Sequence, residues 1–375
     1  SLWNALKGSA AVKSGLLQNL EDTILMIPGI AEDIVSDIAT NIIRQPLIAY
    51  TQHACRTYAI PMDNAVDSGP FWDPNQEEWR QQFTQLPTIN GSRLLLIPKA
   101  IVRRRMDYEP AEYYRDYILE FLRQKELDQN TALVELLKNG KRRVTIKALK
   151  QKYGEGKQAI YEQSLEHPEI LKSYRRDKDG HVSPPLSHEA LAESMGTPPP
   201  NWQQLIDAVL AVPTGRDHAT AYERAIEQLL TALFYPALSN PRIQNQIHNG
   251  RKRIDIAYDN MAEGGLFRWL SLHFRATEIQ IECKNYASDP ANPELDQLAG
   301  RFSQHRGQIG FLVCRTFQDK PLFMQRCIDT AHDHRGFIVP LDDDDLHELT
   351  NERLHPDTAD SLKFKLIEER IRQLL

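Results

Sequence analysis

The sequence predicts an α/β domain in the C-terminal half of the chain, preceded by a mainly helical N-terminal domain. Beyond residue 206, helical apolar periodicity alternates with short runs of β-forming residues, which is typical of a sheet flanked by helices. Before residue 180, apolar residues recur mostly at helical spacing, as at Ile30, Ile34 and Ile38. The 375 residues also exceed the length of one typical domain.

The elements of the C-terminal half follow one another as α-β-β-β-α-β, with a further helix and strand behind them. The segment 242–258 is expected to form a hairpin that turns at Asn249 and Gly250, because this pair is typical of two-residue turns. The other expected elements are a helix at 219–234, a strand at 278–286, a helix at 293–304, a strand at 308–314, a helix at 322–331 and a strand at 336–341. Together they predict a mixed sheet flanked by helices.

Domain limits follow from the same patterns. Residues 1–180 form the helical domain, which includes one short strand at 94–97, and residues 181–205, with two proline clusters, form a linker. Residues 206–350 form the α/β domain, and 351–375 end the chain with an amphipathic helix. The apolar stripe of that helix predicts self-association.

Composition excludes some classes of function. A net charge of -6 argues against a protein that coats nucleic acid through bulk positive charge, whereas an enzyme that holds cations among carboxylates stays compatible. Four cysteines without CxxC spacing suggest neither a zinc site nor a disulfide framework, which fits a reducing cytoplasm. Charged residues interrupt the apolar stretch 16–50, so we expect no membrane span.

The strand at 278–286 carries the residues most suggestive of chemistry. Alternation places Gln280, Glu282 and Lys284 on one face of this strand. Asp255 lies between two isoleucines of the neighbouring hairpin strand, where an uncompensated charge is costly, so it is expected to converge with Glu282. Two carboxylates that hold Mg²⁺ beside a lysine suit the hydrolysis of a phosphodiester.

These residues resemble the PD-(D/E)xK phosphodiesterases, most closely Mrr-like restriction endonucleases and Holliday-junction resolvases, over residues 215–346. The resemblance implies a restriction-endonuclease-like fold with Asp255, Glu282 and Lys284 at its centre. It adds Glu223 of the first helix and Gln297 of the helix after the lysine strand. It also implies Mg²⁺ or Mn²⁺ held by Asp255, Glu282 and the backbone carbonyl of Cys283. The segment 259–277 departs from the family pattern, and an inserted helix or extended strand is expected there.

The implied function is a metal-dependent endonuclease that cleaves DNA, with duplex DNA expected, in bacterial restriction or antiphage defence. The first domain would sense a substrate, a partner protein or the oligomeric state. Self-association is expected because cutting both strands with one active site per chain needs two copies. Alternatives are a structure-selective repair nuclease and a catalytically idle nuclease fold that acts as a nucleic-acid-binding or assembly module.

Several residues also have a structural interpretation. Glu282 and Lys284 would make an exposed ion pair if their strand lay at a sheet edge, and Glu227 competes with Glu223 one turn later. The pair His332 and His334 is expected to cap a helix end. The basic stretch 138–176 suits either nucleic-acid backbone or a solvated helical face, because glutamates are mixed into it.

Overall fold

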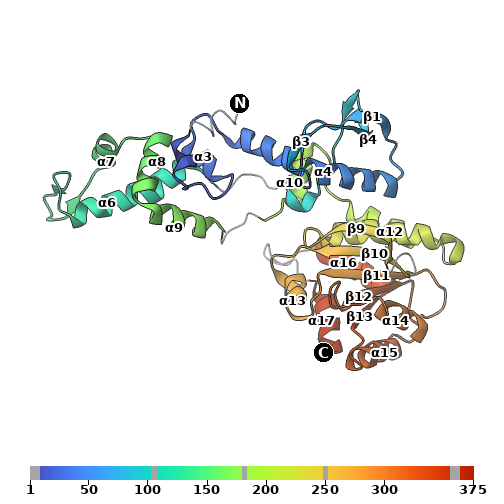
Figure 1. The fold of residues 1–375 in the computed structure, drawn as a ribbon. Helices are drawn as coiled ribbons and strands as arrows, with labels where there is room; N and C mark the ends of the chain where they lie inside the picture. The colour runs from blue at the N-terminus through green and yellow to red at the C-terminus, as the bar shows by residue number, and fades with distance from the viewer. Residues whose placement is uncertain (1–8, 103–107, 180–183, 248–251, 355–363) are drawn as a thin grey trace. The chain divides into compact units, whose positions relative to one another are not determined.

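The computed structural model describes residues 9–102, 108–179, 184–247, 252–354 and 364–375. The chain forms two compact units (Figure 1). The N-terminal unit comprises Ser1–Ile97 and Arg103–Pro184, and the sheet-bearing unit comprises Pro98–Val102 and Pro185–Leu375.

The N-terminal unit is built mostly from helices, as predicted. Its longest helix, α4, spans 26 residues and begins where Glu32 and Asp33 favour the positive end of the helix dipole. The helices are α2 (Ala10–Lys13), α3 (Asp22–Met26), α4 (Glu32–Thr57), α5 (Pro110–Glu112), the π-helical η2 (Tyr113–Ile118), α6 (Leu119–Asp128), α7 (Ile146–Tyr153), α8 (Lys157–Glu166) and α9 (Pro168–Asp179). A buried ion pair of 2.6 Å between Asp22 and Arg175 joins α3 to α9.

The eight short strands described in this unit were not predicted. They form two-stranded pairs and are β1 (Asp63–Asp67), β2 (Phe71–Asp73), β3 (Glu78–Arg80), β4 (Phe83–Leu86), β5 (Thr88–Ile89), β6 (Ser92–Arg93), β7 (Glu135–Leu136) and β8 (Arg142–Arg143). The strand expected at 94–97 is wrong, because that segment pairs with no strand. Its backbone instead makes isolated hydrogen bonds. One of them runs from the Leu96 N–H to the Thr51 hydroxyl of α4, with 2.9 Å between nitrogen and oxygen.

The sheet-bearing unit contains the predicted mixed sheet of five strands. Its order is β13-β12-β11-β10-β9. The strands are β9 (Leu238–Ile247), β10 (Lys252–Asn260), β11 (Glu278–Lys284), β12 (Ile309–Cys314) and β13 (Phe337–Leu341). Strands β9, β10 and β11 pair antiparallel, whereas β11, β12 and β13 pair parallel through crossover helices. The expected turn at Asn249 and Gly250 lies outside the described residues.

Helices surround this sheet (Figure 1). The helices of this unit are η1 (Lys99–Ile101), α10 (His188–Met195), α11 (Trp202–Leu210), η3 (Arg216–His218), α12 (Ala219–Phe234), α13 (Gly265–His273), α14 (Asn292–Ala299), α15 (Lys320–His332), α16 (Asp343–Leu354) and α17 (Lys365–Leu374). Helix α13 occupies the segment 259–277, so the inserted element is a helix. Large buried side chains such as Phe234, Phe267 and Phe311 form the core between helices and sheet.

The expected linker at 181–205 is wrong for most of its length. Helix α10 and the start of α11 lie there, each begun by a side-chain cap, Ser187 and Asn201 respectively. The prolines that suggested a linker mark helix boundaries instead, because proline cannot continue a helix from within. His188 anchors α10 to the sheet-bearing unit, with its Nε2 3.0 Å from the carbonyl oxygen of Ala232.

The C-terminal helix α17 uses its apolar stripe within its own unit. Ile367, Ile371 and Leu374 are each at most 1% exposed and belong to the core cluster of the sheet-bearing unit. Self-association through this stripe is therefore a wrong expectation, since the surface it needs is already covered. Among the described residues, no helix combines the length and apolar character needed to cross a membrane.

Candidate functional site

The predicted acidic residues lie on neighbouring strands at the centre of the sheet. The last paired residues of β10 and β11 are Ile256 and Ile281. One step further along the same antiparallel register, Asp255 lies opposite Glu282. The strand pairing therefore brings the two carboxylates together, as the sequence predicted.

A side-chain hydrogen bond continues the pairing of β10 and β11 at this point. The backbone N–H of Cys283 donates to Asp255 Oδ2, with 3.0 Å between nitrogen and oxygen. Asp255 is 6% exposed. The Asp255 carboxylate is thus bound to the backbone of Cys283, the residue between Glu282 and Lys284. The backbone carbonyl of Cys283 was the third expected metal ligand.

Glu282, Lys284 and Gln297 form one hydrogen-bonded chain. Lys284 Nζ donates to Glu282 Oε1 over 2.8 Å and to Gln297 Oε1 of α14 over 3.2 Å. Alternation along β11 agrees with the sequence, because Ile279, Ile281 and Cys283 belong to the apolar core. The polar face is buried as well, with Glu282 1% and Lys284 8% exposed, so the exposed edge-strand ion pair is wrong.

Glu223 approaches the same carboxylates from α12. Its Oε2 accepts a hydrogen bond from Gln244 Nε2 of β9, and Gln244 lies opposite Asp255, between the residue pairs Ile254–Asn245 and Ile256–Ile243 of the two strands. The competing Glu227 is engaged elsewhere, since the hydroxyl of Thr231 donates to its Oε1 over 3.0 Å. Glu223 is therefore the helical glutamate that faces the site.

Mutual repulsion among the three carboxylates affects their protonation. Burial raises the pKa of Glu223, and the nearby charge of Asp255 raises it further. The pKa of Glu282 is also raised, first by burial and then by Asp255, and its two cationic neighbours do not fully offset these effects. At Lys284, burial alone would lower the pKa, but the Glu282 carboxylate outweighs it and holds the ammonium charged.

Two further residues of this cluster were missed from the sequence. Arg301 Nη1 donates to Glu282 Oε2, and the arginine is 6% exposed. The expected helix at 293–304 would have placed Arg301 four residues after Gln297 on the same side, but α14 ends at Ala299 and Arg301 lies beyond it. Gln244 had no such signal: its positive φ of 54° turns the chain locally within β9, which only the folded backbone reveals.

The cluster is not a ready-made metal cage. Within the described ranges, no three His, Cys, Asp or Glu side chains form a group arranged to hold a metal ion. The donor types nevertheless suit Mg²⁺ or Mn²⁺, because both prefer carboxylate oxygens, and a cation would relieve the repulsion among Glu223, Asp255 and Glu282. A cation that bound Glu282 would compete with Lys284 at Oε1 and with Arg301 at Oε2.

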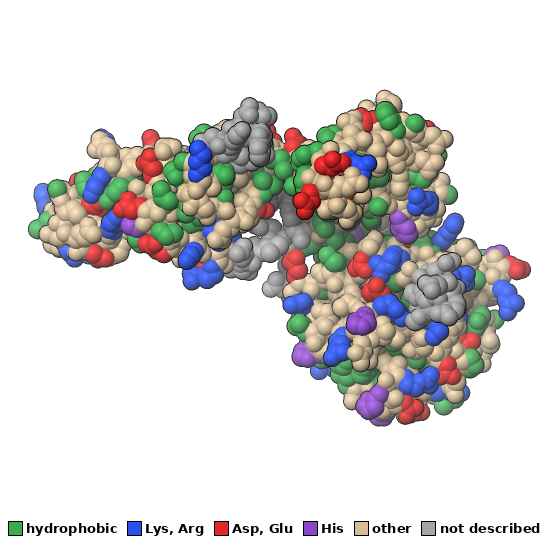
Figure 2. Space-filling view, viewed as in Figure 1, with side chains coloured by type: hydrophobic (Ala, Val, Ile, Leu, Met, Phe, Trp, Pro, Cys, Tyr) green, Lys and Arg blue, Asp and Glu red, His purple; other side chains and the backbone are tan. Residues whose placement is uncertain are grey.

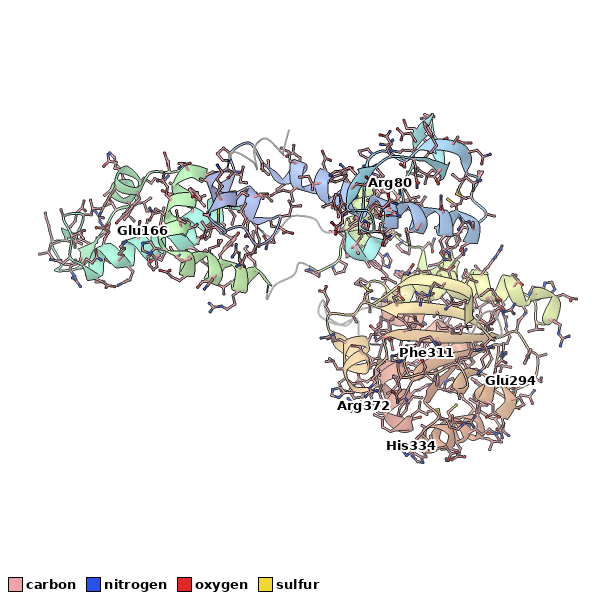
Figure 3. The ribbon with its side chains drawn as sticks, viewed as in Figure 1. Arg80, Glu166, Glu294, Phe311, His334 and Arg372 are labelled. Atoms are coloured by element: carbon pink, nitrogen blue, oxygen red, sulfur yellow. The ribbon has the colours of Figure 1, made fainter. Side chains whose placement is uncertain are left out.

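Other residues singled out from the sequence lie apart from this cluster. Figure 3 shows His334 at the outside of the sheet-bearing unit, whereas Phe311 lies within its sheet. Helix α15 ends at His332, in agreement with a helix-end role for the two histidines. In the basic stretch 138–176, lysines and arginines alternate with acidic partners, as in the 2.8 Å pair of Lys150 and Glu155. On the face drawn in Figure 2, basic and acidic side chains are likewise interspersed.

Comparison with known proteins gives one partial match. The model of a domain of unknown function, DUF8370, matches residues 1–109. These residues carry none of the carboxylates described above. No curated protein matches the chain. No solved structure matches it either.

Proposed function

We propose that the sheet-bearing unit is a divalent-metal-dependent endonuclease of the PD-(D/E)xK class that hydrolyses phosphodiester bonds of DNA. The observation that carries this proposal is the convergence of Asp255 and Glu282 on adjacent strands, with Lys284 two residues further along β11. Burial of these charges is costly, and a catalytic role gives a physical reason to retain them.

Each residue has a distinct part in the proposed reaction. Asp255, Glu282 and the Cys283 carbonyl would hold Mg²⁺ or Mn²⁺, which when bound supplies charge neutralisation and acidifies water. Lys284 carries a full positive charge next to Glu282, so it would orient the attacking water and stabilise charge on the phosphate. Gln297 keeps the lysine directed into the cluster through the 3.2 Å bond.

The charge of the cluster supports a phosphodiester as substrate. Glu223, Asp255 and Glu282 contribute three negative charges, and Lys284 and Arg301 contribute two positive ones, which leaves one negative charge. A divalent cation would change this sum to one positive charge. That charge matches the single negative charge of a phosphodiester group.

The biological setting belongs to the proposal as well. Duplex DNA is the proposed substrate, and restriction or antiphage defence in the bacterial cytoplasm is the proposed role. The N-terminal unit would sense a substrate, a partner protein or the oligomeric state, and a homo-oligomer would allow both strands to be cut. The interface of that oligomer would have to lie elsewhere than on the apolar stripe of α17, which is buried in its own unit.

A second candidate is a catalytically idle nuclease fold that binds nucleic acid or assembles with other proteins. One observation favours it: both carboxylate oxygens of Glu282 are engaged, Oε1 by Lys284 and Oε2 by Arg301. A buried ion cluster of this kind can be structural alone. The two candidates differ in whether a divalent cation enters the cluster.

Cleavage assays separate these candidates. The full chain would be incubated with supercoiled plasmid, linear duplex and single-stranded DNA, each with Mg²⁺, with Mn²⁺ and with EDTA. The proposal predicts cleavage that EDTA abolishes and that the Asp255→Asn protein lacks. Intact DNA under all metal conditions, together with metal-independent binding, would instead favour the idle fold.

A further inference from the structure

Glu282 is held by two cations, an ammonium and a guanidinium, which differ in their other hydrogen bonds. It is 1% exposed, and each of its oxygens meets one cation, Lys284 at Oε1 and Arg301 at Oε2. A divalent cation cannot take both oxygens while these pairs persist. Each carboxylate oxygen has a second lone pair, but a divalent cation on it would repel the cationic partner already bound there, so the partner with another acceptor is expected to move.

Lys284 is the partner that can move. Its ammonium already has a second acceptor, Gln297 Oε1 at 3.2 Å, so leaving Glu282 Oε1 would not strand it without a hydrogen bond. Its side chain is nearly as buried as that of Arg301, 10% against 8% exposed, so its freedom comes from the second acceptor and the flexible four-carbon stem. Released from Glu282, the lysine remains beside the site through Gln297.

Arg301 is the partner that is fixed. Its backbone carbonyl accepts from Gln280 Nε2 of β11 at 3.4 Å and from Arg306 Nη2 at 3.0 Å. The segment that carries the guanidinium is thereby attached to the strand that carries Glu282. The planar guanidinium also matches a carboxylate better than an ammonium does.

We propose that Arg301 is a positioning residue, which stays on Glu282 Oε2 and directs Oε1 to the divalent cation, while Lys284 is displaced toward Gln297. This inference rests on the proposed function. It specifies that Glu282 binds the cation through one oxygen only. It also gives the displaced lysine its place next to the substrate phosphate.

Calorimetric titration of the full-length protein with Mn²⁺ tests this division of roles. Arg301→Gln should weaken Mn²⁺ affinity by about tenfold or more, the effect typical of removing a residue that orients a metal ligand. Arg301→Lys should recover part of the loss. Lys284→Met should bind Mn²⁺ at least as tightly as the parent, because a competitor for Oε1 is gone.

The matched control is Arg335→Gln, which removes an arginine paired with Asp296 of α14 at 2.7 Å, outside the cluster. It should leave Mn²⁺ affinity unchanged. Thermal unfolding in EDTA checks that each variant is folded. If Arg301→Gln fails to fold, the other two variants decide. Weaker Mn²⁺ binding by Arg301→Lys together with undiminished Mn²⁺ binding by Lys284→Met would support the inference.

The outcomes that overturn the inference are separate from those that overturn the function. Equal or tighter Mn²⁺ binding by folded Arg301→Gln would mean that the arginine competes with the cation, while the proposed nuclease stands. Weaker binding by Lys284→Met would reverse the roles of the two cations. A parent protein that binds no Mn²⁺ at millimolar concentration would refute both the proposed function and the role of Arg301.

Discussion

Asp255 on β10 accepts a hydrogen bond from the backbone N–H of Cys283 on β11, with 3.0 Å between Oδ2 and the nitrogen. This bond uses one carboxylate oxygen and leaves Oδ1 out of it. The pairing of β10 and β11 thus places the negative charge of Asp255 next to Glu282, on rigid strands and not on a flexible loop. Rigid placement of this kind is what an electrostatic site requires.

Replacing Asp255 with asparagine should abolish activity while preserving the fold. The asparagine carbonyl can still accept from Cys283 N–H, but the charge is lost, and we expect plasmid cleavage to fall by about a hundredfold or more. Asp259→Asn is the control, because Asp259 lies on the same strand and pairs with Arg242 instead. A folded Asp255→Asn protein that cuts like the parent would exclude Asp255 from the site.

Replacing Lys284 with methionine should reduce single-turnover cleavage about a hundredfold at saturating Mn²⁺. The physical reason is the loss of the one ammonium held charged next to Glu282. Lys365→Met, on the exposed surface of α17, provides a lysine control that should cleave normally. Comparable rates for the two variants would remove Lys284 from the mechanism.

Substitutions of the two glutamates of α12 should have different effects, one on metal binding and the other on stability. Glu223→Gln should weaken Mn²⁺ binding by about tenfold, since this carboxylate faces Asp255. Glu227→Gln should leave Mn²⁺ binding unchanged and lower only the unfolding midpoint, because Glu227 is 2% exposed and accepts from Thr231. Calorimetry and thermal melts on both proteins decide, and the opposite pattern would transfer the role to Glu227.

Asp343 at the start of α16 should make stability depend on pH. Burial raises its pKa to about 6 from 3.8, although Arg315 and Tyr222 favour the charged form. Because the folded pKa lies above the unfolded one, this group's contribution is fully present below pH 3.8 and is lost as pH rises through about 6.

The change in unfolding free energy between pH 5 and pH 7.5 should therefore be smaller in Asp343→Asn than in the parent. Urea unfolding at both pH values measures this difference. Asp333→Asn, an exposed aspartate just beyond α15, should behave as the parent does. The same pH difference in the parent and in Asp343→Asn would show that Asp343 does not titrate in this range.

Truncating the core residue Ile371 should destabilise the unit without changing its oligomeric state. Ile371 is 1% exposed within the core, and an isoleucine-to-alanine change at such a site typically costs about 2–5 kcal/mol. Glu369→Ala, two residues away on the exposed face of α17, should cost little. Light scattering would contradict this prediction if Ile371→Ala dissociated an oligomer while its unfolding free energy stayed unchanged.

Local sequence pattern determined most of the sheet-bearing unit. Alternation along 278–284 predicted which residues of β11 join the core and which form the polar face, because strand geometry has a fixed period of two. The charge of Asp255 between two isoleucines predicted that Asp255 lies next to Glu282, because an uncompensated buried charge is costly. The same local reasoning failed at 181–205, where prolines mark helix ends as well as linkers.

Only the tertiary structure decided what surrounds these residues. It buried the polar face of β11, paired Arg301 with Glu282, and chose Glu223 over Glu227. It also buried the stripe of α17 inside its own unit, where the sequence alone suggested a partner. The physical reason is common to all four. Period and composition specify which face of an element is apolar or charged, but the element that covers that face is specified by contacts between residues far apart in the chain.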